Sequence, residues 1–120
     1  MERAIARNEV AVVRWLLDHA AVGDMAGYRL CPIEALRVLD GCNCGCTSLD
    51  FQPNSWSGSS IIADGFAIYS DGQQAGLILW GRNGGIALLE VYDCDPNASH
   101  RFPNISDLRS FADGMTAGRR

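Results

Sequence analysis

Residues Ala75 to Tyr92 have the sequence A-G-L-I-L-W-G-R-N-G-G-I-A-L-L-E-V-Y, and this stretch decides the fold. Two apolar runs flank Asn83-Gly84, and Asn-Gly between apolar runs is typical of a β-hairpin because both residues tolerate positive φ. The first run is apolar throughout Leu77–Trp80, and Glu90 is the one charged residue of the second. Strands that are apolar on both faces belong in the middle of a covered sheet. The sequence therefore predicts a hairpin at the core of a small domain.

Further strands are expected on the N-terminal side of this hairpin. Ile61 to Tyr69 predicts a strand, which Asp71-Gly72 turns back into the hairpin. The result is an antiparallel meander of residues 61–69, 75–80 and 86–92. Asp64-Gly65 inside the first of these strands indicates a β-bulge. Two shorter strands are expected at Leu36–Leu39 and Thr47–Gln52.

Helices are expected near both ends of the chain. Ala4 to about Val22 has its apolar residues at helical spacing, and Gly23 ends this helix. A single helical turn is expected at Pro32–Ala35, where proline suits the first position. Ser106 is a suitable N-cap for a short helix from Asp107 to Ala112.

The expected fold class is α+β, an antiparallel sheet of four to five strands with the N-terminal helix and the short C-terminal helix on one face. Residues 1–114 form one expected globular domain, and residues 115–120 an expected disordered tail. Two small helices cannot cover both faces of a sheet whose central strands are apolar on both. We therefore expect the uncovered face to contact another protein chain, and a second copy of this chain is the commonest such partner.

The composition bounds the classes of partner. The 120 residues carry a formal charge of −4, and no stretch is rich in arginine. This charge argues against nucleic acid and against an anionic membrane surface as partners. The chain contains no lysine, which excludes Schiff-base chemistry. No apolar run approaches the ~20 residues of a membrane helix, and Met1-Glu2-Arg3-Ala4 lacks the layout of a signal peptide, so we expect a cytoplasmic protein.

Three of the five cysteines lie within one short stretch, as Cys42, Cys44 and Cys46. In an extended strand such thiols lie about 6.6 Å apart, whereas the sulfurs on a tetrahedral zinc lie about 3.8 Å apart. All three could bind one metal only in a turn, which the intervening glycines and asparagine permit. The favoured interpretation is that the cysteines pack as small apolar residues, and the alternatives are a zinc site or a redox or catalytic thiol. The candidates for a fourth ligand are Cys31, Cys94, His19 and His100.

Three further residues are candidates for binding or for acid–base chemistry. Glu90 is expected to share one strand face with Ile86, Leu88 and Tyr92. Its carboxylate, if buried alone, would have a raised pKa, but pairing with an arginine such as Arg82 or Arg101 is favoured. The other two candidates are Trp56, in the polar loop from Pro53 to Ser60, and His100.

The sequence contains no P-loop, no G-x-G-x-x-G and no G-x-S-x-G. It therefore favours a non-enzymatic binding or protein-interaction module, for which no cofactor is expected. The alternative is a zinc-binding or thiol-redox protein centred on residues 42–46. The cysteine stretch and Leu89-Glu90-Val91-Tyr92 resemble small bacterial domains without an assigned function, a resemblance that implies no mechanism.

Overall fold

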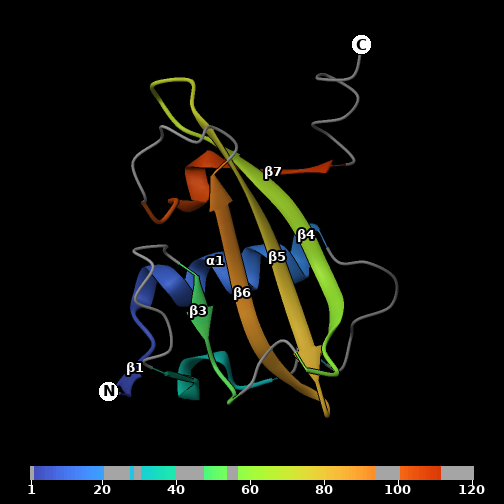
Figure 1. Ribbon diagram of the computed structural model, residues 1–120. Coiled ribbons are helices and arrows are strands. Elements are labelled where there is room, and N and C mark those ends of the chain that lie inside the picture. Colours follow the sequence, from blue (N-terminus) through green and yellow to red (C-terminus); the bar gives the residue numbers. More distant parts are fainter. Residues whose placement is uncertain are drawn as a thin grey trace.

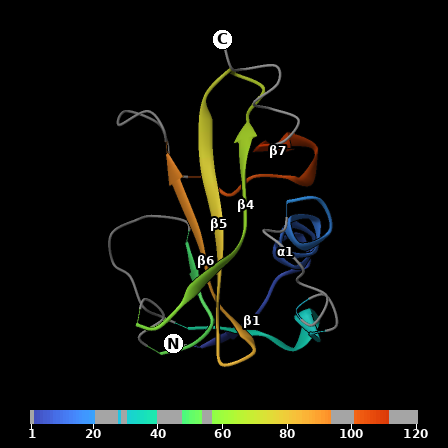
Figure 2. The same ribbon diagram turned by 90° about the vertical axis from the view of Figure 1, so that its right-hand side faces the viewer.

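The computed structural model describes residues 2–20, 28, 31–39, 48–53, 57–93 and 101–111. Its main element is a five-stranded antiparallel sheet with the strand order β3-β6-β5-β4-β7. Helix α1 (Arg7–His19) lies against one face of this sheet (Figure 1 and Figure 2). The fold is therefore α+β, as predicted. The five strands are β3 (Leu49–Asp50), β4 (Ser60–Ile68), β5 (Gln74–Arg82), β6 (Gly85–Asp93) and β7 (Leu108–Ser110).

The central meander is the predicted one. Strands β5 and β6 are joined by a two-residue turn in which Asn83 has φ 55° and Gly84 has φ 79°. Positive φ at both positions is the signature of a type I′ turn, whose twist matches that of the flanking strands. The β4–β5 turn also needs a glycine, because Gly72 has φ 88°. Asparagine and glycine thus fix the register of both hairpins.

The irregularities of the sheet lie at positions that the sequence did not indicate. The bulge predicted at Asp64-Gly65 is wrong, because pairing with β5 is regular there and the register shifts at Ile62 instead. A second shift lies at Ala87, between the pairs Trp80–Leu88 and Gly81–Ile86. This shift turns Ile86 into the core, where it is 2% exposed, so the prediction that Ile86 shares a face with Glu90 is also wrong.

Helix α1 is shorter than predicted and begins after Ala6, which has no side-chain oxygen to cap it. The carboxylate of Glu9 instead accepts a hydrogen bond from the Ala6 N–H at 2.8 Å. Its buried face is the predicted apolar stripe and packs on β4. Just after the helix, the Ala20 carbonyl accepts the Asp64 N–H at 3.2 Å, which ties the helix end to β4. The fully buried helix residues are Val12, Val13, Leu16 and Leu17.

The predicted C-terminal helix at Asp107–Ala112 is wrong. The chain forms a 3-10 turn, η2 (Ile105–Asp107), and then strand β7, which pairs with Gly65–Ala67 of β4. Asp107 closes the turn, because its carboxylate accepts the Asn104 N–H at 3.1 Å. The burial of Leu108 and Ser110 on either side of exposed Arg109 then follows the period of a strand.

A small second sheet holds the N-terminus against the middle of the chain. Strand β1 (Arg3–Ala4) pairs with β2 (Arg37–Val38), which lies within the strand predicted at residues 36–39. The predicted turn at residues 32–35 is the 3-10 helix η1 (Ile33–Ala35). No helix in the described ranges is long and apolar enough to cross a membrane. The predicted tail, residues 115–120, lies outside the described residues.

Candidate interaction surface

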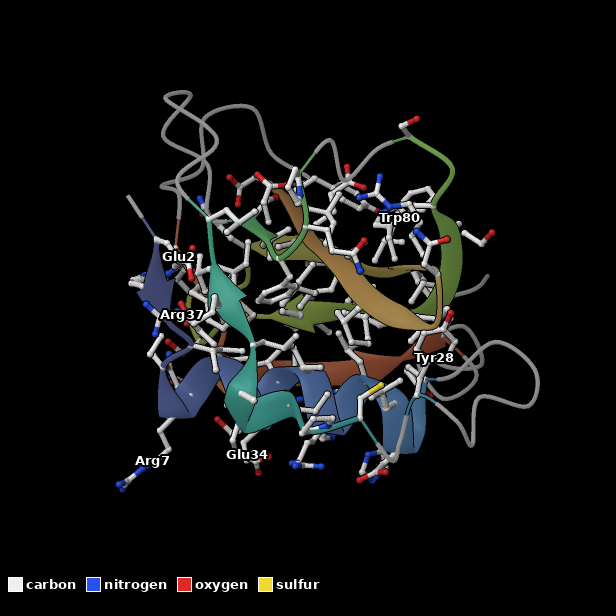
Figure 3. The ribbon with its side chains drawn as sticks, turned by 90° about the horizontal axis from the view of Figure 1, so that it is seen from below. Glu2, Arg7, Tyr28, Glu34, Arg37 and Trp80 are labelled. Carbon is white, nitrogen blue, oxygen red and sulfur yellow. The ribbon has the colours of Figure 1, made fainter. Side chains whose placement is uncertain are left out.

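We call the face of the main sheet that points away from α1 the outer face. Cross-strand partners lie on the same side of a sheet, so the register defines this set. Figure 3 shows Trp80 on the side of the sheet away from α1, and Tyr28 on the side of the helix. The outer face consists of Asp50 on β3, Ile61, Asp64, Phe66 and Ile68 on β4, Gln74, Gly76, Ile78, Trp80 and Arg82 on β5, Leu88, Glu90 and Tyr92 on β6, and Arg109 on β7.

The two faces of the sheet differ sharply in exposure. On the helix side, Leu77 and Leu79 are 0% exposed. On the outer face, Ile61 is 40%, Ile68 36% and Tyr92 42% exposed. Exposed apolar residues that gather on one face mark interaction sites more often than scattered ones do. Among the described residues, helices lie on only one face of the sheet, which confirms the prediction.

Glu90 lies near the middle of the outer face and is half-buried. Its Oε1 accepts a hydrogen bond from the indole Nε1 of Trp80, at 3.2 Å. Within the described ranges no arginine forms an ion pair with Glu90, so the favoured pairing with Arg82 or Arg101 is not what the structure contains. Arg101 instead binds the carboxylate of Asp71 at 2.9 Å.

Aromatic side chains occupy the part of the outer face next to Glu90. A Cβ on Gly76 would lie 2.0 Å from Cζ of Tyr92, so the Tyr92 ring covers the β5 backbone where only glycine leaves room. Phe66, in the same cross-strand row, contacts the ring of Phe111 with centroids 5.2 Å apart. This end of the outer face is therefore an aromatic surface.

Arg82 lies at the hairpin end of the outer face and holds an adjacent loop. Its Nε donates to Oε1 of Gln52 at 3.0 Å, and its two Nη atoms donate to the carbonyls of Ser57 and Pro53 at 2.8 and 2.6 Å. Gln52 in turn donates to the Arg82 carbonyl at 3.3 Å. The guanidinium thus fixes the two sides of a loop to the hairpin, and its role is structural.

Of the cysteines singled out by the sequence, Cys31 lies within the described residues. Cys31 is half-buried, with its Sγ 3.9 Å from the Gly84 carbonyl oxygen. Among the residues that the structure describes, no group of three or more histidine, cysteine, aspartate or glutamate side chains could hold a metal ion. His19, the other described candidate, ends α1 with its Nδ1 3.1 Å from the Trp15 carbonyl oxygen. The sequence candidates Cys42, Cys44, Cys46, Cys94, Trp56 and His100 lie outside the described residues.

The shifted pKa values belong to groups that hold the fold together. Burial acts to raise the pKa of Glu9, but hydrogen bonds from Arg3 and the Ala6 N–H and the charge of Arg3 lower it overall. The backbone N–H of Gln73 and the Arg101 guanidinium lower the pKa of Asp71. Burial raises the pKa of Tyr69. None of these residues belongs to the outer face.

The outer face offers aromatic, aliphatic and carboxylate side chains, and its members include no serine, cysteine or histidine. Such a set offers a partner apolar contact area and carboxylate oxygens that accept hydrogen bonds. Sequence analysis singled out Glu90 and missed Asp64, Phe66 and Ile68, because only the register assigns them to this face. Comparison of the chain with protein-family models, curated proteins and solved structures found no match.

Proposed function

We propose that this protein is a non-enzymatic interaction module that binds another polypeptide through its outer face. One observation carries the proposal. Ile61, Ile68 and Tyr92 are 36–42% exposed on one side of a sheet whose other side buries its apolar side chains under α1.

Burial of these side chains gives a partner a source of affinity. Completely burying one side chain of this size contributes roughly 1.5–3 kcal/mol relative to full exposure, so burying the remaining exposed area contributes a part of that for each. Association must offset the loss of rotational and translational freedom, so the partner must cover most of the face. A sheet face suits such a contact, because its strands hold the side chains rigidly.

Co-purification tests this function. The tagged protein is expressed in cells that make the natural chain, beside the double variant Ile68→Ser/Tyr92→Ser. The matched control is Ile105→Ser, which removes an isoleucine that is 50% exposed but lies in η2, off the outer face. We expect a polypeptide, or a second copy of this chain, to co-purify with the wild type and the control and to be lost from the double variant. Equal recovery with all three proteins would refute the proposal.

The second candidate function is a zinc-binding or thiol-redox protein, and it rests on three thiols within residues 42–46. Elemental analysis of the purified protein separates it from the first. About one zinc per chain, with melting temperature lowered by EDTA, would support the metal function, because ligands of one site contribute as a unit. Metal-free protein with unreactive thiols would exclude the zinc-binding and thiol-redox functions, and the interaction module would remain as the proposed function.

A further inference from the structure

One row of side chains across the middle of the outer face indicates the chemistry of the partner. The register places Asp64 of β4, Ile78 of β5 and Glu90 of β6 side by side. Since neighbouring strands lie about 4.8 Å apart, the two acidic residues are separated by roughly 10 Å, with Ile78 between them. All three side chains are half-buried. We call these three residues the acidic row.

The acidic row makes the centre of the outer face negative. In the part of the chain that the structure describes, neither Asp64 nor Glu90 takes part in an ion pair. The arginines of the outer face lie at its margins, and their guanidinium groups donate elsewhere. Arg82 binds the Gln52 side chain and two loop carbonyls, and Arg109 binds the carbonyls of its own strand and of Ser106.

Apolar and aromatic side chains lie on both sides of the acidic row. Ile61 and Trp80 form the neighbouring row toward the hairpin end, and Phe66 and Tyr92 lie in the row on the other side. A long basic side chain fits this arrangement, because its apolar stem can lie over Ile78 while its charge reaches a carboxylate. The aromatic rings add attraction for a cation above their faces.

The same row disfavours a second copy of this chain as the occupant. In a two-fold symmetric contact the same patch of both copies meets itself. A dimer axis through the middle of the outer face would bring Asp64 and Glu90 of one copy against the same carboxylates of the other. Like charges brought together in an interface oppose association by several kcal/mol.

We propose that the outer face binds a basic, apolar segment of another protein, with an arginine or lysine side chain placed over Ile78 between Asp64 and Glu90. This inference rests on the proposed function and specifies its partner. The formal charge of −4 on the whole chain favours the approach of such a partner. Nucleic acid is negatively charged, as the acidic row is, and therefore does not fit this face.

Fluorescence anisotropy with a defined probe tests the inference. The probe is a fluorescein-labelled nine-residue peptide that alternates leucine and arginine, and its matched peptide carries neutral citrulline in place of each arginine. We expect the arginine peptide to bind the full chain at least tenfold more tightly than the citrulline peptide. We also expect the difference to shrink as NaCl is raised from about 50 to 500 mM, because salt screens exposed charge pairs.

Two variants with equal loss of charge locate the binding. In Asp64→Asn/Glu90→Gln the glutamine keeps an oxygen that can accept the Trp80 indole hydrogen bond, so the sheet should fold as before. The control, Asp18→Asn/Glu34→Gln, removes two exposed carboxylates from α1 and η1. We expect the first variant to lose at least tenfold in affinity for the arginine peptide and the control to lose less than twofold.

Three results would overturn the inference: equal binding of both peptides, equal affinities of both variants, or absence of binding up to millimolar peptide. A sedimentation mass of twice 13.0 kDa at micromolar protein would also overturn it if the mass fell to that of a monomer in Ile68→Ser/Tyr92→Ser. After any of these results, the proposed function as an interaction module still stands if co-purification depends on Ile68 and Tyr92. Loss of that dependence removes the proposed function itself.

Discussion

At the scale of single residues, the turn at Asn83-Gly84 gives the clearest link between sequence and fold. Gly84 has φ 79°, and a Cβ added there would meet no heavy atom within 4 Å. Any cost of a side chain at this position therefore comes from the backbone conformation alone. Positive φ is strained for β-branched residues and much less so for asparagine.

We expect Gly84→Val to lower the free energy of unfolding by about 1–3 kcal/mol, because valine is strained at this φ. Gly84→Asn serves as the matched control and should cost less than half as much. Urea unfolding of the three proteins measures the difference. Equal stability of the valine variant and the wild type would show that the turn does not need its positive φ.

A second residue-scale interaction fastens the N-terminus to the start of α1. The Arg3 guanidinium donates to both oxygens of Glu9, at 2.9 and 2.7 Å, while Oε1 of Glu9 also accepts the Ala6 N–H. The Glu9 residue is 8% exposed, so water competes little for its carboxylate. These bonds favour the charged form and lower its pKa in the folded state despite burial.

The lowered pKa makes part of the stability depend on pH. The contribution of Glu9 is complete above the ordinary glutamate pKa, near 4.5, and is lost as the pH falls through the lower folded-state value. We expect Glu9→Gln to lose less stability between pH 6 and pH 3 than the wild type does. Glu34→Gln, which alters an exposed pair with Arg14, should behave like the wild type. Identical pH profiles for all three proteins would contradict this account.

At the scale of elements, the outer face depends on a contact between neighbouring strands. Tyr92 of β6 covers Gly76 of β5 so closely that a Cβ on Gly76 would lie within 2.0 Å of the ring. The ring is 42% exposed, so a methyl group at Gly76 would displace it toward solvent rather than disrupt the core. The contact thus fixes where the Tyr92 ring lies on the outer face.

A double-mutant cycle measures this contact. Gly76→Ala alone should lower the free energy of unfolding by roughly 0.2–1 kcal/mol, because it displaces the Tyr92 ring from its cross-strand contact. In the Tyr92→Ala background the same change should cost nothing or stabilise slightly, because alanine is favoured over glycine within a strand. The difference between the costs of Gly76→Ala in the two backgrounds is the interaction energy between Gly76→Ala and Tyr92→Ala. Additive effects, measured by thermal unfolding, would show that the ring does not cover Gly76.

The sequence predicted the elements whose signals are local. Asn83-Gly84 and Gly72 determine the two hairpins, and apolar periodicity determines α1. The C-terminal segment was mispredicted because Leu108–Ser110 becomes a strand only by pairing with residues 65–67 of β4, a partner distant in sequence. Local propensity carries no information about such pairing.

The division of the sheet into two faces was also only partly predictable. The alternation of side chains along β6 is interrupted at Ala87, and this shift sends Ile86 to the core and leaves Glu90 on the outer face. One extra residue in a strand moves all the side chains that precede it to the opposite face of the sheet. The face on which a residue lies can therefore be assigned only when the register is known. For this reason the sequence identified Glu90 but not its neighbours Asp64 and Phe66.

At the scale of the whole molecule, one layer is formed by α1 with the 3-10 helices and the other by the sheet (Figure 2). A two-layer fold necessarily leaves one sheet face to solvent, to loops or to a partner. The outermost strands β3 and β7 have 2 and 3 residues, so each pairs with only part of the nine-residue strand beside it. The broad face that α1 and the 3-10 helices leave uncovered is the outer face.

Photo-crosslinking from single positions tests this central claim most directly. Benzoylphenylalanine is placed at Ile68, on the outer face, or at Ile105, which is 50% exposed but off this face, and the cells are irradiated. The account predicts a crosslinked species larger than the 13.0 kDa chain from position 68 and none from position 105. No adduct from position 68, or equal adducts from both positions, would contradict it.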